Sequence, residues 1–135
     1  MNLRLVDVFS KANAAQVLWR LLIERDPEVN ISHRRMPSYD EHVAFVESKP
    51  YQAWYLIENE DEIVGSIYLT HIREIGIFIF KEVRGKGIGT LAMAELQKLH
   101  PGRFLANIAP MNVKSQRFFI KHGFRLIQHT YEYGA

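Results

Sequence analysis

Cysteine is absent from this chain of 135 residues, so disulfide bonds, thiolate nucleophiles and thiolate metal sites are excluded. The six histidines form neither an HExxH motif nor a close His-x-His pair, and we therefore expect no metal. No apolar run approaches the ~20 residues that span a bilayer, and the opening MNLRLVDVFS lacks the apolar core of a signal peptide. These absences predict a cytoplasmic protein without membrane contact.

An excess of charge of one sign is also missing. The 17 basic and 15 acidic side chains leave a net charge of +2, and the basic ones are scattered, so we expect no nucleic acid partner. The chain does have 47% hydrophobic residues, enough to form one core. No linker, repeat or low-complexity segment divides it, and we expect a single domain over residues 1–135.

Hydrophobic periodicity predicts a mixture of strands and helices. Strands are expected at 3–9, 51–58, 62–72, 74–80, 103–109 and 124–133. Helices are expected after Ser10, after Ser38 (spaced with Glu41 as a capping box), from the glycine-rich segment to Pro101, and from Asn112 to Gly123. The three central strands follow one another as an antiparallel meander. The order favours one layered α/β domain.

Glycine is concentrated in one place. The stretch FKEVRGKGIGTLAMAEL, residues 80–96, holds three of the 8 glycines and continues directly into a helix. Such a turn presents free backbone N–H groups and the positive end of the helix dipole to an anion, and phosphate fits best. Arg84, Lys86 and Thr90 supply further donors. The pattern is neither a P-loop nor a dinucleotide-binding motif; a simple tight turn remains the alternative.

The segment EIGIFIFKEVRGKGIG resembles the signature of the GNAT superfamily of acyl-CoA N-acyltransferases, [Q/R]xxGx[G/A], with Arg84, Gly87 and Gly89 at its fixed positions. A second segment, NIAPMNVKSQRFFIKHGF, is similar to another motif of that superfamily. The resemblance covers nearly the whole chain. It implies a mixed, mostly antiparallel sheet of about six strands with helices on both faces and a V-shaped gap between strands four and five. We expect the seventh strand of the family to be missing.

The resemblance also implies acetyl-CoA as co-substrate. It assigns the coenzyme A pyrophosphate to the glycine loop and the pantetheine arm to the main chain of the fourth strand and to the last helix. The residues concerned are Ile77, Ile79, Arg84, Gly85, Lys86, Gly87, Ile88, Gly89, Thr90, Asn112, Ser115, Phe118 and Phe119.

Transfer to an amine needs a base, because an ammonium group with a pKa of roughly 10 must lose a proton. Glu74 is our candidate, since many members of the superfamily place a carboxylate at the start of this strand. Alternatively, Glu74 is a surface charge paired with Arg73, and His71 is the second candidate base. Gly76, within an apolar strand, marks a bulge that turns an N–H toward the thioester, or packs under an aromatic ring.

The family often protonates the departing thiolate with a tyrosine of the last helix. Phe119 occupies that position here. The general acid therefore stays open between Tyr131, Tyr133, a water molecule and no protein group, because a thiolate with a pKa near about 8.5 is already a fair leaving group.

The acceptor amine is expected to bind the polar segment 26–43, which lies between the first two helices. His33, Arg34, Arg35 and Tyr39 favour an anionic acceptor such as a nucleotide-linked amino sugar, or else form a solvated loop. Asn107 faces the acceptor or satisfies backbone groups. The favoured function is acetyl transfer to a primary amine of a small molecule. Transfer to a protein amine and acyl-CoA binding without turnover remain the alternatives.

The final predicted strand has only Gly134 and Ala135 after it. An open edge that carries Ile127, Tyr131 and Tyr133 favours a homodimer. Alternatively, the chain is a monomer whose edge is protected by charged and polar residues: Arg125, His129 and Glu132.

Overall fold

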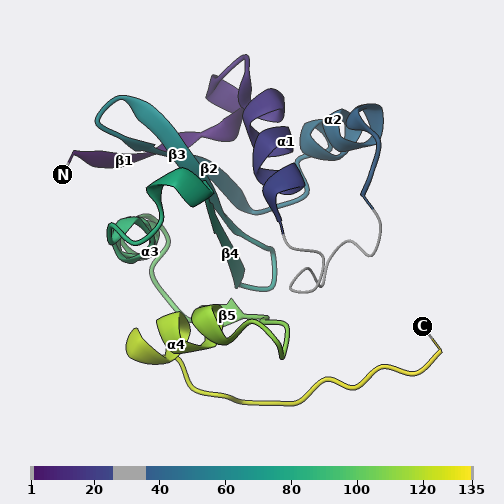
Figure 1. Cartoon of the computed structure of the whole chain (residues 1–135), viewed down its shortest axis with the longest axis vertical. Helices are drawn as coiled ribbons and strands as arrows, with labels where there is room; N and C mark the ends of the chain where they lie inside the picture. The colour runs from purple at the N-terminus through teal and green to yellow at the C-terminus, as the bar shows by residue number, and fades with distance from the viewer. Residues whose placement is uncertain (1, 26–35, 135) are drawn as a thin grey trace.

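The computed structural model describes residues 2–25 and 36–134 (Figure 1). Their strands are β1 Leu3–Asp7, β2 Ala53–Asn59, β3 Glu62–Leu69, β4 Glu74–Ile79 and β5 Leu105–Ala106. Their helices are α1 Ala14–Glu24, α2 Tyr39–Glu47, α3 Ile88–Leu99 and α4 Val113–Lys121, with short 3-10 turns η1 Val8–Ser10 and η3 Lys81–Val83. No helix in these ranges is long and apolar enough to cross a membrane.

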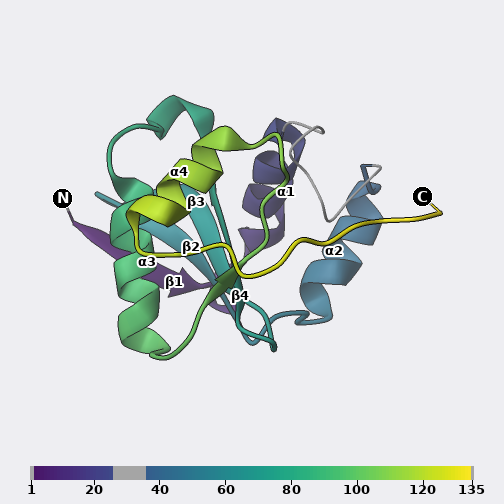
Figure 2. The same ribbon diagram turned by 90° about the horizontal axis from the view of Figure 1, so that it is seen from below.

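The strands form one sheet in the order β1-β2-β3-β4-β5. The first four pair antiparallel, which confirms the predicted meander, and β5 lies parallel to β4. Helices α1 and α2 cover one face, while α3 and α4 cover the other (Figures 1 and 2). The predicted fold class, a mixed and mostly antiparallel sheet between helices, is therefore confirmed.

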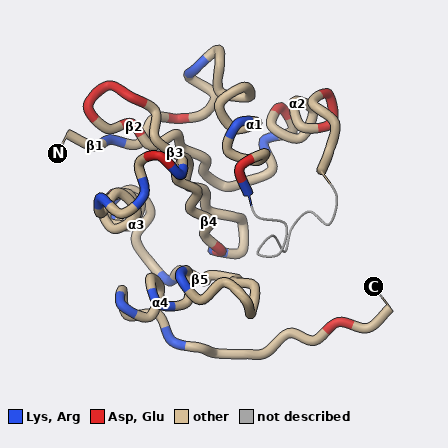
Figure 3. Tube along the Cα trace, viewed as in Figure 1, with Lys and Arg blue, Asp and Glu red and all other residues tan. Residues whose placement is uncertain are grey.

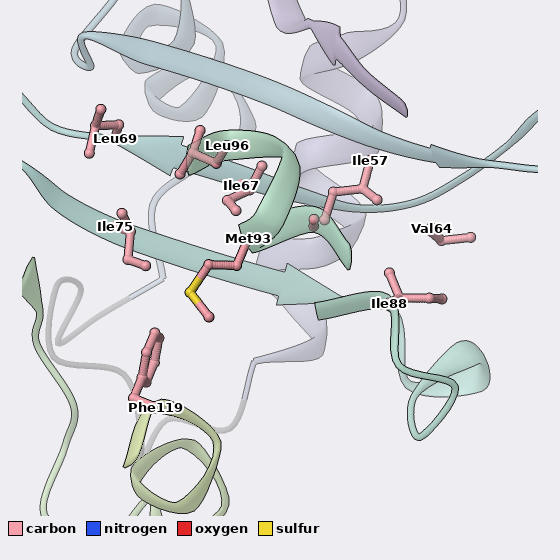
Figure 4. Close-up of a cluster of buried hydrophobic side chains, with 10 residues drawn as sticks. Ile57, Val64, Ile67, Leu69, Ile75, Ile88, Met93, Leu96 and Phe119 are labelled. Carbon is pink, nitrogen blue, oxygen red and sulfur yellow. The ribbon is translucent and has the colours of Figure 1, made fainter. Parts of the chain in front are cut away.

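Two cores result because successive strand residues point to opposite faces. Ile57 belongs to the core beneath α3 and α4, and its neighbour Leu56 to the core beneath α1 and α2. Figure 4 shows the first core, in which Met93 of α3 and Phe119 of α4 lie close to the strand residue Ile75. Both sets of helices are thus fixed to one sheet.

Side-chain caps set the starts of α2 and α4. Ser38 accepts a hydrogen bond from the Glu41 N–H at 3.1 Å, and the Glu41 carboxylate accepts from the Ser38 N–H at 2.8 Å, so the predicted capping box is confirmed. The predicted start after Ser10 is wrong. Ser10 lies in η1, where its hydroxyl donates to the Asp7 carbonyl at 2.7 Å, and α1 begins after Asn13 without a side-chain cap.

The predicted sixth strand at 124–133 is not formed. Phe124 donates its N–H to the Phe119 carbonyl, and beyond it no backbone hydrogen bond joins 125–134 to another described residue. The segment runs out extended after α4, yellow in Figure 1. A strand-like sequence remains unpaired here because the sheet ends at β5, which has only two residues.

Candidate active site

Strands β4 and β5 separate soon after they meet. Their pairing is limited to Glu74 with Leu105 and Ile75 with Ala106. From Gly76 to Ile79 the edge of β4 that faces away from β3 therefore has no partner strand among the described residues. This is the V-shaped gap that the resemblance implied, and we call it the β4/β5 opening.

The glycine loop ends beside this opening, at the start of α3. Six consecutive backbone N–H groups, from Gly85 to Thr90, have no acceptor within the described residues. Gly85 and Gly87 adopt φ values of 83° and 76°, a region that favours glycine, with open space where a Cβ would stand. Gly87 is the N-cap and has no side chain to occupy the free donors. An anion is the natural partner for such a helix start.

The charge around the loop is positive. Helix α4 carries three basic residues and no acidic one (Figure 3). Lys86 is exposed in the loop, whereas the Arg84 Nε donates to the Ile79 carbonyl at 3.1 Å and ties the loop to β4. Ile77 and Ile79 are the two main-chain positions predicted for the pantetheine arm. The Ile79 carbonyl already accepts the hydrogen bond from Arg84.

The Thr90 side chain has a structural partner. The His122 Nδ1 lies 2.7 Å from the Phe118 carbonyl and so carries a proton, and in the neutral ring Nε2 accepts from the Thr90 hydroxyl at 2.9 Å. This contact joins α4 to the first turn of α3. The Thr90 backbone N–H remains available to a ligand.

Helix α4 completes the wall of the opening. A Cβ on Gly89 would lie 3.1 Å from the Phe118 ring, so glycine allows α3 and α4 to approach there. Phe119 is 9% exposed and belongs to the core. The Asn112 side chain accepts from the Ser115 N–H at 3.2 Å and caps α4. These residues of the second motif therefore hold α4 against α3.

Glu74 and Asn107 meet across the base of the opening. The Asn107 Nδ2 donates to Glu74 Oε2 at 2.6 Å, and the Glu74 N–H donates to the Thr70 hydroxyl at 2.9 Å. The alternative pairing of Glu74 with Arg73 is wrong, because the Arg73 guanidinium donates to the His100 and Arg103 carbonyls instead. Glu74 is half-buried and is held in place by a neutral donor.

Gly76 packs under an aromatic ring, as one of the two predicted alternatives stated. A Cβ at this position would overlap the Tyr68 ring, which pairs across from it on β3. Burial raises the Tyr68 pKa, the positive charge of Arg25 and a hydrogen bond with Tyr51 offset part of this rise, and the negative charge of Glu74 adds a smaller rise. Tyr68 therefore stands beside Glu74 on the face covered by α1 and α2.

The predicted acceptor residues are only partly described. His33, Arg34 and Arg35 lie outside the described residues. Tyr39 begins α2 and packs edge-on against Trp19, with ring centroids 5.3 Å apart. Tyr131 and Tyr133, candidates for the general acid, are 88% and 103% exposed on the segment after α4. His71, the second candidate base, is exposed in the turn before β4.

Sequence reasoning missed Tyr68 and its neighbours Tyr51 and Arg25. The Tyr51 and Tyr68 rings stack with centroids 4.0 Å apart, and the Arg25 guanidinium lies 3.6 Å from the Phe78 ring centroid. A signal did exist: a glycine inside an apolar strand of a meander predicts a large cross-strand neighbour, and the hairpin register makes that neighbour Tyr68.

The resemblance implied an α/β sheet that opens beside the start of a helix suited to bind an anion. The structure has this arrangement, which is typical of acyl-CoA-dependent transferases. The family model described as the acetyltransferase (GNAT) family matches residues 16–124. The chain belongs to this family. Both recognised motifs lie within or overlap the matched range.

Similar proteins agree at this level. A peptidyl-lysine N-acetyltransferase of Salmonella typhimurium is 33% identical over 73 residues, which are 54% of this chain and 50% of that protein, so the match spans half of the relative. A ribosomal L7/L12 α-N-protein acetyltransferase in complex with coenzyme A has a TM-score of 0.76 at 18% identity, covering 95% and 82% of the two chains. A dodecameric spermidine N-acetyltransferase from Vibrio cholerae has a TM-score of 0.66 at 19% identity, covering 95% and 81%. These structures share the fold.

Proposed function

We propose that the chain is an N-acetyltransferase that transfers an acetyl group from acetyl-CoA directly to a primary amine of a small molecule. The observation that carries the proposal is the row of six N–H groups from Gly85 to Thr90, which have no acceptor among the described residues and lie beside the edge of β4 that no described strand pairs with. Donors for a pyrophosphate and a slot for an extended arm thus adjoin each other. Glu74 lies at the other end of the same slot.

The residues present fit coenzyme A. The backbone of 84–90 would hold the pyrophosphate, and the basic residues of α4 would add positive charge. Main chain at Ile77 and the partner-free edge of β4 would hold the pantetheine arm, against the wall formed by Phe118. Acetyl-CoA supplies an acetyl group on a thioester, which is reactive toward a neutral amine.

Glu74 acts as the general base in this proposal. An amine with a pKa of roughly 10 is protonated at neutral pH and must lose a proton before it attacks. Asn107 donates to Oε2 and so orients the carboxylate, while Oε1 remains to accept the proton. The proton donor to the departing thiolate stays open between Tyr131, Tyr133, a water molecule and no protein group.

A protein amine is the second candidate acceptor, favoured by the relative that is named a peptidyl-lysine N-acetyltransferase. The cytoplasmic location and the homodimer remain predictions.

Incubation with acetyl-CoA and a panel of amines tests the proposal, with free thiol as the readout. The panel should contain amino sugars, a nucleotide-linked amino sugar, polyamines and a lysine peptide. We expect thiol release with at least one small amine. Release with the peptide alone would move the acceptor to the protein class. Acetyl-CoA binding without release under any condition would indicate a binding domain that does no chemistry.

A further inference from the structure

A small cavity lies between α1, α2 and the sheet, on the same sheet face as Glu74. Its volume is about 50 Å³, and its wall includes Arg25, Tyr51, Trp54, Ser66, Tyr68 and Phe78. A water molecule takes up about 30 Å³ in the liquid, so a group of carboxylate size fits this space. The cavity lies outside the proposed acetyl-CoA slot.

One buried donor on the wall lacks an acceptor. The Trp54 side chain is 92% buried, at 8% relative exposure, and its indole N–H has no hydrogen-bond partner in the described part of the chain. Buried N–H groups are almost always paired, because an unmade hydrogen bond is costly away from water. Because the Trp54 side chain lines the cavity, an oxygen atom bound there is the candidate acceptor once the indole ring turns its N–H toward it.

The cavity also carries the positive charge of Arg25. Among the described residues, neither an aspartate nor a glutamate lines the cavity, and none forms an ion pair with Arg25. Burial lowers the Arg25 pKa, as expected for a cation that has lost water without gaining an anion. The His42 ring on the same wall is already committed, with Nε2 2.9 Å from the Ala15 carbonyl.

Aromatic rings form the rest of the wall. Tyr51 and Tyr68 stack with an angle of 3° between their planes, and Arg25 covers the Phe78 ring. Such surfaces favour an apolar segment leading to a polar end. The cavity wall therefore combines aromatic surface with two donor groups, the Arg25 guanidinium and the Trp54 N–H, that have no acceptor among the described residues.

The position of the cavity relates it to the chemistry. Glu74, Gly76 and Phe78 are alternate residues of β4 on one face, roughly 7 Å apart at each step. The acceptor amine would lie at Glu74, and the oxyanion would lie at Arg25, above Phe78. The two groups are thus roughly 7 to 13 Å apart, which is the length of an extended chain of about two to four residues. The Tyr68 ring covers Gly76 between the two positions, so a molecule that reaches both groups has to pass along this ring.

We propose that this cavity binds the acid group, carboxylate or phosphate, of the acceptor, and that the acceptor is an amine with an acid at its far end. The proposal depends on the proposed acetyl transfer, whose amine it describes further. Arg25 binds the oxyanion with charge, and the Trp54 N–H donates to a second oxygen.

Matched acceptors test the proposal by kinetics. 6-Aminohexanoate and 8-aminooctanoate are compared with hexylamine and octylamine at saturating acetyl-CoA. We expect a kcat/KM at least tenfold higher for the acids, through KM, and loss of this preference in Arg25→Gln without any change for the alkylamines. Arg20→Gln is the control, since Arg20 covers the Phe80 ring at 4.7 Å but does not line the cavity. Equal kcat/KM for acids and alkylamines in the unmodified protein would overturn the proposal.

A second measurement requires no turnover. The chain has only two tryptophans, so Trp54→Phe assigns the two indole N–H signals in a nitrogen-15 spectrum. Hexanoate should shift the Trp54 signal, hexanol should not, and Arg25→Gln should abolish the shift. If hexanoate shifts the Trp54 signal but the protein acetylates no amine, the proposed acetyl transfer is wrong and the anion site is still supported. Acetylation without any shift would disprove the anion site alone.

Discussion

At the scale of single residues, the pair Glu74 and Asn107 is the most informative feature of the site. The two side chains come from opposite sides of the β4/β5 opening and meet at 2.6 Å. A neutral amide donor orients a carboxylate without neutralising its charge, which suits a base better than the ion pair with Arg73 that the sequence allowed. Glu74 lies at the start of β4, and the hydrogen bond from its N–H to the Thr70 hydroxyl holds this end of the strand in place.

Replacing Glu74 with glutamine should lower turnover by roughly 10²-fold, because the amide cannot take up the proton of the ammonium. The affinity for acetyl-CoA should hardly change, since Glu74 does not contact the glycine loop. Steady-state kinetics and acetyl-CoA titration measure the two quantities. Asn107→Ala serves as the companion variant and should reduce turnover less. If Glu74→Gln turns over as fast as the unmodified protein, Glu74 is not the general base, and His71 or a water molecule takes up the proton instead.

The half-buried residues Tyr51 and Tyr68 allow a prediction about pH. Burial raises the pKa of Tyr51 and Tyr68 above the usual value of about 10. The folded protein therefore binds these protons more tightly than the unfolded chain, and the resulting stability is present below about pH 10 and is lost as the pH rises above it. Urea midpoints at pH 8 and pH 11 should differ less in Tyr51→Phe than in the unmodified chain. An identical alkaline loss in the variant would contradict the burial of this phenol.

At the scale of elements, the glycine loop and α3 form the unit on which acetyl-CoA binding depends. Valine at Gly87 would be forced into a left-handed conformation that side chains avoid, by about 1–2 kcal/mol or more, so the loop should rearrange. We expect acetyl-CoA to raise the melting temperature of the unmodified protein and not of Gly87→Val.

Gly123→Val is the matched control for that variant. Gly123 has a φ of 89° at the end of α4 and similarly open surroundings, so valine imposes comparable strain away from the loop. The control should melt earlier and still respond to acetyl-CoA. An unaltered response in Gly87→Val would mean that the loop is only a turn.

Elements with local signals were predictable. The capping box at Ser38, the glycine loop and the meander depend on residues close in sequence, and the structure has all three. The features that sequence reasoning missed depend on distant partners. Residues 124–133 have the composition of a strand and lack a neighbour to pair with, while the cavity at Arg25 exists only because α1 packs over β4.

At the scale of the whole molecule, the segment after α4 is the unusual feature. Leu126, Ile127, Tyr131 and Tyr133 are between 52% and 103% exposed, and the backbone of 125–134 has no hydrogen-bonded strand beside it within the described chain. An extended apolar segment of this kind readily pairs with another chain. This observation replaces the predicted sixth strand as the reason to expect a homodimer.

Sedimentation at micromolar concentration tests the dimer. We expect the intact chain to dimerise and Tyr131→Lys to shift it toward monomer, because a charge would then be buried in the contact. Gln128→Lys is the control, as Gln128 is already polar. A single monomeric species for the intact chain at every concentration would contradict the expectation, and a dimer that survives Tyr131→Lys would place the interface elsewhere.

The central claim is that the unpaired N–H groups of the glycine loop bind the phosphates of coenzyme A. Backbone amide resonances, recorded with and without coenzyme A, test it most directly. The account predicts that the signals of Gly85, Lys86, Gly87, Ile88, Gly89 and Thr90 shift together and that their hydrogen exchange slows as they gain acceptors. Coenzyme A binding that leaves these six amides unshifted and exchanging as before would contradict it.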